Sequence, residues 1–187
     1  MSINGHRTIW LMAAISVLPM IAAFVFYVVW RPQGGINHGE LLETRPLPHT
    51  VLSDLTGNTF SSDQLLGKWL LVTIQPPACD KKCQSKLYYL RQARLTQGEN
   101  MNRIERLWLL NGSGTPEQSL IAGHPGLRIA RPVDPAWLAT FPTKGAAAEH
   151  IYLIDPLGNL VLRYNDDVNP KGMVNDLTRL LKVSRLG

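Results

Sequence analysis

The two cysteines of this 187-residue chain, Cys79 and Cys83, lie four positions apart in the stretch "QPPACDKKCQSKL". Residues at positions i and i+4 of a helix project from the same face, about 5 to 6 Å apart at their Cβ atoms. Two sulfur atoms placed there can form a structural disulfide, act as a redox pair or hold one soft metal ion. They can also be two small buried residues without chemistry. A disulfide across so short a loop constrains the unfolded chain little, so a purely structural disulfide is the weaker interpretation.

The residues around the pair favour reactive thiolates. We expect a helix over about 79–97, so both thiols would lie in its first turn, at the positive end of the helix dipole. Lys81 and Lys82 add positive charge, whereas Asp80 opposes the thiolate.

The two thiols are not equivalent in this pattern. Cys83 shares a helix face with Leu87 and Leu90, so we expect it to be the more buried of the two. Cys79 would then be the exposed, reactive cysteine.

Arg91 and Arg94 fall inside the apolar stripe of the same helix. Their aliphatic stems can pack against the core while the guanidinium groups reach solvent. The alternative interpretation is a docking patch for an acidic partner.

Composition limits the classes of function. The chain has 19 Lys and Arg against 14 Asp and Glu, a net charge of +5, but its basic residues are scattered, with no run longer than Lys81-Lys82. A nucleic-acid-binding protein would be expected to show a basic stripe or a known module, so we expect no nucleic-acid partner. The positive charge suits a position near an anionic membrane surface.

The N-terminal part predicts a membrane anchor. Residues 9–30, "IWLMAAISVLPMIAAFVFYVVW", contain no charge and would form a helix of about 33 Å, enough to cross a bilayer. A cleaved signal peptide is the alternative, but the apolar run is longer than usual and no cleavage pattern follows. We therefore expect a short flank over 1–8, a single span over 9–30, a Gly- and Pro-rich tether over 31–46, and a folded domain over 47–187.

The order of elements predicts an α/β fold of the thioredoxin-like class, a central mixed sheet flanked by helices. The expected elements are a strand, a turn and a helical turn within 49–67, a buried strand over 68–75, the cysteine helix, a buried strand over 105–111, a helix capped by Thr115, a hairpin over 150–165 and an amphipathic helix over 171–186.

Residues 46–183 resemble the Sco/SenC family of membrane-tethered, thioredoxin-fold proteins, which are associated with assembly of the copper centre of cytochrome oxidase. The segments that carry the resemblance are "LTGNTFSSDQLLGKWLLV", the Cys79-x-x-x-Cys83 spacing, "TPE" at 115–117 and "YLIDPLGNLV" at 152–161. The three-residue gap between the cysteines is the distinguishing feature, since most thioredoxin relatives have two.

The resemblance implies Cu(I) bound by Cys79, Cys83 and a histidine five positions before the tyrosine of the "YLI-P-G" strand. That position is Ala147 here, and His150 is the candidate third ligand. The implied partners are the copper-site subunit of cytochrome c oxidase or other assembly factors. The implied location is the inner membrane, with a single span and the domain in the periplasm, an oxidising compartment that a close cysteine pair suits.

The sequence departs from the family at the site. The usual proline after each cysteine is replaced by Asp80 and Gln84, and the "D-P-x-R-D-T-P" loop has become "NGSGTP" at 111–116. Three functions remain open: copper handling, which the resemblance favours; thiol-disulfide reduction, with Cys79 attacking and Cys83 resolving; and a non-catalytic accessory scaffold.

Overall fold

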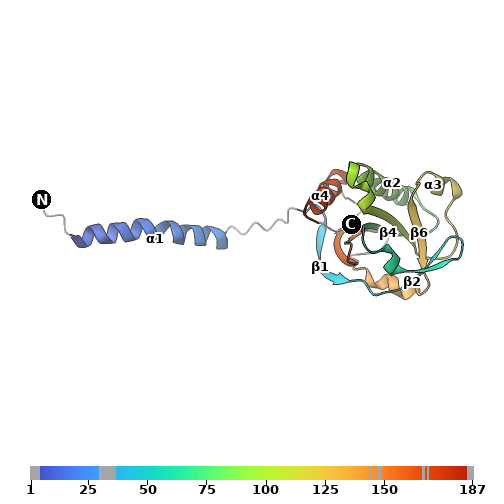
Figure 1. Cartoon of the computed structure of the whole chain (residues 1–187), viewed down its shortest axis with the longest axis horizontal. Helices are drawn as coiled ribbons and strands as arrows, with labels where there is room; N and C mark the ends of the chain where they lie inside the picture. The colour runs from blue at the N-terminus through green and yellow to red at the C-terminus, as the bar shows by residue number, and fades with distance from the viewer. Residues whose placement is uncertain are drawn as a thin grey trace. The chain divides into compact units, whose positions relative to one another are not determined.

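The computed structural model describes residues 5–29, 37–143, 145–146, 149–165, 167 and 169–184. The chain divides into two compact units, Met1–Ile36 and Asn37–Gly187, and each is described by itself (Figure 1).

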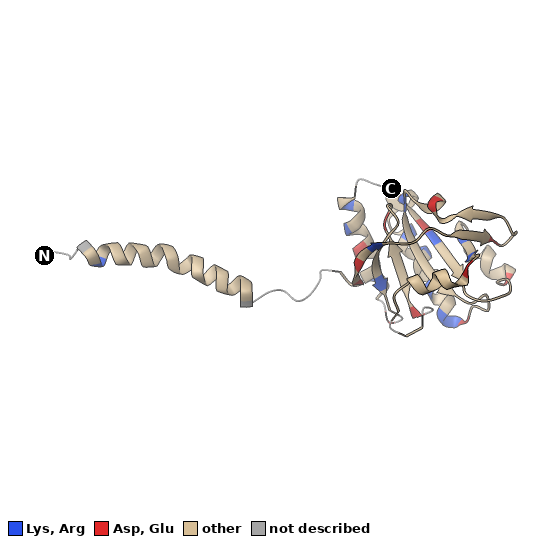
Figure 2. Ribbon diagram, turned by 90° about the horizontal axis from the view of Figure 1, so that it is seen from below, with Lys and Arg blue, Asp and Glu red and all other residues tan. Residues whose placement is uncertain are grey.

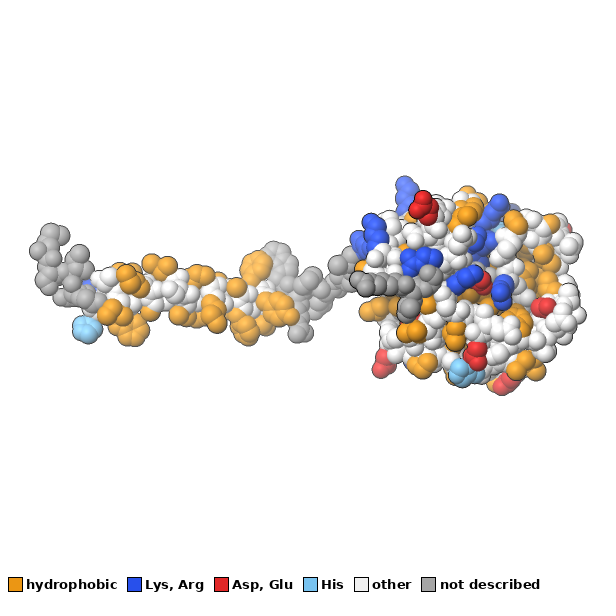
Figure 3. All heavy atoms as spheres, viewed as in Figure 1, with side chains coloured by type: hydrophobic (Ala, Val, Ile, Leu, Met, Phe, Trp, Pro, Cys, Tyr) orange, Lys and Arg blue, Asp and Glu red, His pale blue; other side chains and the backbone are white. Residues whose placement is uncertain are grey.

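The described residues of the first unit form helix α1 (Gly5–Val29), which includes Pro19. Its segment His6–Val28 is long and apolar enough to cross a membrane, and none of that segment is buried inside the unit. Figure 2 shows no charged residue along α1 beyond its first turn, and Figure 3 shows hydrophobic side chains along its visible face. The predicted span over 9–30 is therefore a helix, although residue 30 and the tether over 31–36 lie outside the described residues.

The second unit is built on one mixed sheet with the strand order β1-β8-β7-β4-β5-β6-β2-β3. Strands β4, β5 and β6 run parallel, and the other neighbouring pairs are antiparallel. The strands are β1 (Glu40–Pro46), β2 (Val51–Asp54), β3 (Thr59–Ser61), β4 (Trp69–Gln75), β5 (Ile104–Leu110), β6 (Leu127–Pro132), β7 (Ile151–Ile154) and β8 (Asn159–Tyr164).

Strand β4 lies at the centre of this sheet, between β5 and β7, and all seven of its residues are buried. A continuous apolar run is what a strand covered on both faces requires, because both sets of alternating side chains face a core. The buried strand expected over 68–75 is thus confirmed. Its last residue, Gln75, leads directly into the cysteine segment.

Helices cover one face of the sheet. The long helices α2 (Lys81–Leu95) and α4 (Pro170–Val183) pack together there, as Figure 1 shows, and bury an apolar cluster that includes Leu90, Leu153 and Leu177. The short helix α3 (Gln118–Ala122) and the 3-10 helix η2 (Gly98–Arg103) lie in connections of the sheet. The other face is covered by the 3-10 helices η1 (Ser62–Leu65) and η3 (Pro135–Thr140), whose Leu65 and Trp137 join a second cluster.

Two turns with the sequence pattern D-x-x-G-N are stabilised in the same way, by hydrogen bonds from main-chain N–H groups to the Asp side chain. Asp54 accepts hydrogen bonds from the main-chain N–H groups of Thr56 and Asn58, and Asp155 accepts from those of Leu157 and Asn159. The fourth residue of each turn is a glycine with φ near +90°, a conformation that other residues rarely adopt. These contacts fix the β2–β3 and β7–β8 hairpins, as the sequence predicts.

Two element predictions are wrong in part, and one strand was missed. Residues 40–46 are not tether but edge strand β1, paired with β8, so the folded domain begins before residue 47. Strand β6 was not expected. Helix α3 begins at Gln118, and its N-cap is Glu117, which makes no side-chain capping bond, rather than Thr115.

The start of the domain is fixed onto α4 by one buried carboxylate. Asp176 is 1% exposed and accepts hydrogen bonds from the main-chain N–H groups of His38 (2.9 Å) and Gly39 (2.9 Å) and from the hydroxyl of Tyr164 (3.2 Å). Burial, and secondarily Asp176, raise the pKa of the Tyr164 hydroxyl, so the phenol remains protonated and donates. The packing is close, since a Cβ added at Gly172 would lie 2.6 Å from His38 Cγ.

We predict that Asp176→Ala lowers the free energy of unfolding of this unit by about 3 kcal/mol, because it leaves buried donors without an acceptor. Urea denaturation of the full chain in neutral detergent measures the loss. Asn175→Ala, at an exposed neighbouring position of the same helix, is the control and should change stability by about 0.5 kcal/mol or less. Equal effects of the two substitutions would contradict this account of Asp176.

Candidate functional site

The two cysteines form a disulfide with their Cα atoms 5.2 Å apart. The expectation that the i, i+4 spacing brings both sulfur atoms together is therefore confirmed. One detail is wrong: α2 begins at Lys81, so Cys79 precedes the helix and only Cys83 lies in its first turn. The disulfide thus joins the segment that leaves β4 to the helix that follows it.

Asp80 explains why the helix begins where it does. It is the N-cap, and its carboxylate accepts a hydrogen bond of 2.8 Å from the main-chain N–H of Cys83. Gln84 donates from its side-chain amide to the carbonyl oxygen of Cys79 at 3.1 Å. Asp80 and Gln84 therefore hold the cysteine segment through side-chain hydrogen bonds that a proline at either position could not make.

The two sulfur positions differ in burial as predicted. Cys83 is 1% exposed and packs in an apolar cluster with Leu87 and Trp108, whereas Cys79 is half-buried at the edge of that cluster. The Trp108 indole N–H donates to the main-chain oxygen of Gln75, which fixes the floor of the cluster to the end of β4.

A groove of about 610 Å³ lies beside Cys79, between residues 77–80 and residues 113–117. The far wall is the loop after β5, and it is held by Arg131 of β6. The Arg131 guanidinium donates to the carbonyl oxygens of Gly112 (2.9 Å) and Gly114 (2.7 Å). These two hydrogen bonds therefore join the far wall of the groove to β6.

Sequence reasoning missed two contributions to this site. Asp80 was treated only as a charge opposing the thiolate, although an Asp directly before a helical pattern is an N-cap signal. Nothing in the sequence indicated the role of Arg131, because its hydrogen bonds with the loop join residues far apart in the sequence.

His150 lies at the edge of the sheet where β4 ends, just before β7, and is 2% exposed. Its ring packs edge-on against Tyr152, with centroids 5.9 Å apart, and Tyr152 belongs to the cluster on the face opposite α2. In the described part of the chain no three His, Cys, Asp or Glu side chains lie close enough together to hold a metal ion. The structure thus does not bring His150 to the two sulfur atoms, and its role as a copper ligand stays a prediction. Ala147 lies outside the described residues.

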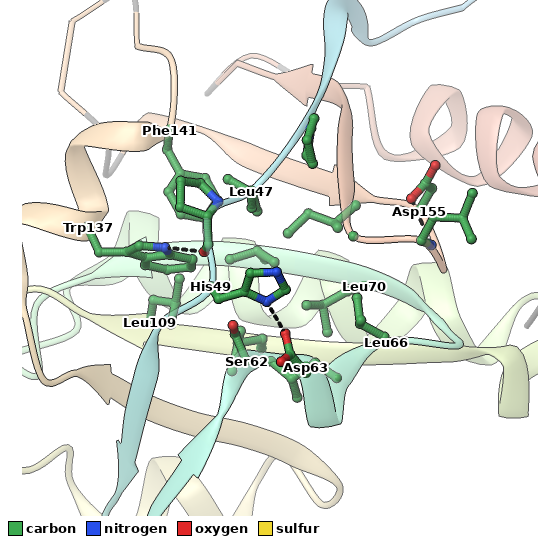
Figure 4. Close-up of a pocket in the computed structure, with 18 residues that line it drawn as sticks. Leu47, His49, Ser62, Asp63, Leu66, Leu70, Leu109, Trp137, Phe141 and Asp155 are labelled. Atoms are coloured by element: carbon green, nitrogen blue, oxygen red, sulfur yellow. Dashed lines mark hydrogen bonds and ion pairs between the residues drawn. The ribbon is translucent and has the colours of Figure 1, made fainter.

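A second pocket, of about 140 Å³, opens on the face of the sheet opposite α2 (Figure 4). Its interior is apolar, with Leu70 and Phe141 among its walls, and His49 pairs with Asp63 at one side. The hydrogen bond from His49, with a smaller contribution from Ser61, lowers the pKa of Asp63. This pocket contains neither cysteine, so it is separate from the candidate thiol site.

The family model of the transmembrane-like, thioredoxin-like, C-terminal domain matches residues 69–184, more than half of the chain. The chain belongs to this family. A search of the curated proteins found no match to the sequence.

Solved structures similar to this transmembrane-like, thioredoxin-like protein include yeast Sco1 with copper bound, 18% identical, with a TM-score of 0.65 over 76% of this chain and 96% of that one. Apo Sco1 of Thermus thermophilus is 16% identical, with a TM-score of 0.60 over 79% and 99%. The thioredoxin domain of a thiol-disulfide oxidoreductase from Bacteroides vulgatus is 16% identical, with a TM-score of 0.53 over 74% and 98%. These similarities confirm the predicted thioredoxin-like fold of the Sco type.

Proposed function

We propose that this chain is a membrane-tethered thiol-disulfide exchange factor that acts on cysteines during assembly of the copper site of cytochrome oxidase. The observation that carries the proposal is the asymmetry of the linked pair. Cys79 is half-buried beside a groove, whereas Cys83 is 1% exposed in an apolar cluster. An accessible attacking thiol with a shielded resolving thiol is the arrangement that exchange requires.

The exchange would begin in the reduced protein. The Cys79 thiolate attacks one sulfur of a partner disulfide, and the partner's other sulfur leaves as a thiolate and takes up a proton. Cys83 then loses its proton and attacks the Cys79 sulfur, which closes the Cys79–Cys83 disulfide and releases the partner's second thiol. Two electrons pass to the partner, and a dithiol protein of the same compartment re-reduces the pair.

Surrounding residues support each step. The positive end of the α2 dipole and Lys81 and Lys82 favour a thiolate near the helix start. The apolar surroundings of Cys83 favour its protonated thiol, which leaves Cys79 as the sulfur that attacks the partner first. The hydrogen bond that the Cys83 N–H donates to the Asp80 carboxylate holds the Cys83 main chain in the first turn, within reach of that sulfur.

The proposed location and partner of the chain follow from its membrane-competent helix and its fold. We place α1 in the inner membrane as a single span and the domain in the periplasm, where disulfides form and persist. The proposed partner is the copper-site subunit of the oxidase or another assembly factor, because cysteines must be reduced before they can bind a metal. The likeness to Sco structures supports this choice.

Copper handling is the second candidate, and the proximity of the two sulfur atoms favours it. Reduced Cys79 and Cys83 would supply two soft thiolates to Cu(I) as cargo, a donor set that fits this ion. His150 is proposed as the third ligand, which would require the segment before β7 to rearrange, because its ring now packs against Tyr152. Exchange is preferred because it needs no group of this chain beyond the two sulfur atoms, which are already bonded to each other.

We predict that full-length Cys83→Ser in its native membrane accumulates a mixed disulfide with a partner, because the attacking thiol remains and the resolving thiol is gone. Non-reducing electrophoresis with mass spectrometry measures the adduct, and Cys79→Ser is the matched control. We expect at least about tenfold more adduct in Cys83→Ser, with the copper-site subunit as the captured protein. Equal amounts in both variants would contradict the assigned roles, and capture of unrelated proteins alone would contradict the oxidase setting.

For copper handling we predict that reduced full-length protein binds Cu(I) in anaerobic competition with a chelator. The double variant Cys79→Ser with Cys83→Ser should weaken binding at least about 100-fold, because no soft ligands remain. His150→Ala should weaken it about tenfold or more if the imidazole completes the site. Unchanged binding by the double variant would exclude the cysteines as ligands, and unchanged binding by His150→Ala would exclude the histidine.

A further inference from the structure

The apolar pocket of about 140 Å³ on the face of the sheet opposite α2 has no part in the proposed thiol chemistry. Its floor is made by side chains of β4 and β5 that are at most 4% exposed, namely Leu70, Val72, Leu107 and Leu109. Figure 4 shows Trp137 and Phe141 on one side of the pocket and Leu66 and Leu70 on the other. The pocket is thus enclosed by apolar and aromatic side chains.

Solvent reaches this pocket through its rim. Residues that line the rim are exposed: the His49 side chain is 80% exposed, the Asp63 side chain 50%, and Leu157 66%. The lining therefore runs from an open rim down to the buried side chains of β4 and β5.

Hydrogen bonds between the walls keep the pocket from closing. The Leu47 N–H donates to the carbonyl oxygen of Gly158 at 3.1 Å, and the Trp137 indole N–H donates to that of Pro48 at 2.7 Å. These bonds join the β1–β2 connection to the β7–β8 turn and to η3. Protein interiors are otherwise close-packed, and unfilled apolar volume of this size is destabilising. A braced pocket of this kind therefore points to an occupant.

The volume of the pocket matches one aromatic ring. An engineered apolar cavity of about 150 Å³ in another protein takes up benzene, whereas drug-sized ligands need roughly 300 Å³ or more. The walls also suit a ring. Trp137 and Phe141 pack edge to face with centroids 5.2 Å apart, and Phe141 packs in the same way against Tyr152 at 5.1 Å. A ring in the pocket can extend this series of edge contacts.

His49 supplies a hydrogen-bond acceptor at the rim. An ionised carboxylate can only accept, so the His49 Nδ1 that pairs with Asp63 carries the hydrogen. That bond lowers the pKa of Asp63, which keeps the carboxylate ionised. Nε2 of the neutral imidazole is then an acceptor, and it makes no hydrogen bond with the described residues. In Figure 4 it points away from Asp63, toward the side of the pocket bounded by Leu47 and Leu70.

We infer that this pocket is a binding site for a small phenol with a single ring. The ring packs on the side chains of β4 and β5, edge-on to Phe141, and the hydroxyl at the rim donates a hydrogen bond to His49 Nε2. Molecules with two or more rings are too large for the volume. The inference does not depend on the proposed thiol chemistry, because the pocket lies on the face of the sheet opposite α2 and neither cysteine lines it.

Methyl NMR of the full chain in phospholipid nanodiscs tests the inference, with phenol as the probe. Leu and Val methyl groups are isotope-labelled, and the free phenol concentration is measured across a dialysis membrane, because phenol also enters bilayers. Phenol should shift the signals of Val72, Leu107 and Leu109 saturably, with a dissociation constant of about 1 mM or lower. The signals of Leu90 and Leu177, which lie in the cluster under α2 and α4, should not move.

A second ligand and two variants separate the ring from the hydroxyl. Toluene has the shape of phenol, with a methyl group in place of the hydroxyl. His49→Leu, at an exposed position, should weaken phenol binding by about threefold or more, because the acceptor is lost, and should change toluene binding by less than about twofold. Gln118→Leu makes a polar-to-apolar change at an exposed position of α3 and should leave both affinities unchanged.

Several results would overturn the inference. They are the absence of a saturable shift at the pocket methyl groups, an equal response of Leu90 and Leu177, and a His49→Leu variant that binds phenol unchanged or loses phenol and toluene affinity equally. Nuclear Overhauser contacts from lipid acyl chains to Val72 or Leu109 would identify a lipid chain as the occupant and would also overturn it.

Discussion

The structure depends on how the chain passes from buried strand β4 into helix α2. The strand ends at Gln75, whose carbonyl oxygen accepts the Trp108 indole N–H. The helix begins at Lys81 because Asp80 caps it. Between these two fixed points the disulfide joins a half-buried sulfur to one enclosed by apolar side chains. The chemistry of the site follows from this arrangement, because the segment before α2 places the Cys79 sulfur beside the groove while the apolar cluster encloses the Cys83 sulfur.

The central part of the fold could be predicted because its signals are local. The continuous apolar run of β4 indicates a strand covered on both faces, and the spacing of Cys83, Leu87 and Leu90 indicates which thiol is buried. Edge strand β1 falls within the predicted tether because the segment is rich in Gly, Pro and polar residues, and most of the β1 side chains face solvent, as is common at the edge of a sheet. These residues form a strand because they pair with β8, which lies more than a hundred residues away in the sequence.

The site itself could be predicted only in part. The cysteine pair and its unequal burial follow from spacing. The position of His150 depends on which side of the sheet its side chain occupies just before β7, which the sequence does not indicate. Contacts between segments far apart in the sequence could not be predicted either. The hydrogen bonds of Arg131 with the loop after β5 are an example. Arg91 and Arg94 were recognised as unusual in an apolar stripe, but the main-chain carbonyl oxygens to which they donate depend on the packing of α2 on the sheet.

The central claim is that the Cys79–Cys83 disulfide is reversible under the conditions of its compartment. The reduction potential of this couple, measured in the full chain against glutathione buffers, tests it most directly. Exchange factors of this fold lie between about −120 and −270 mV, whereas structural disulfides lie below about −300 mV. The account predicts a value in the first range. A value below about −300 mV would contradict it and would leave the disulfide as a structural link in an anchored domain.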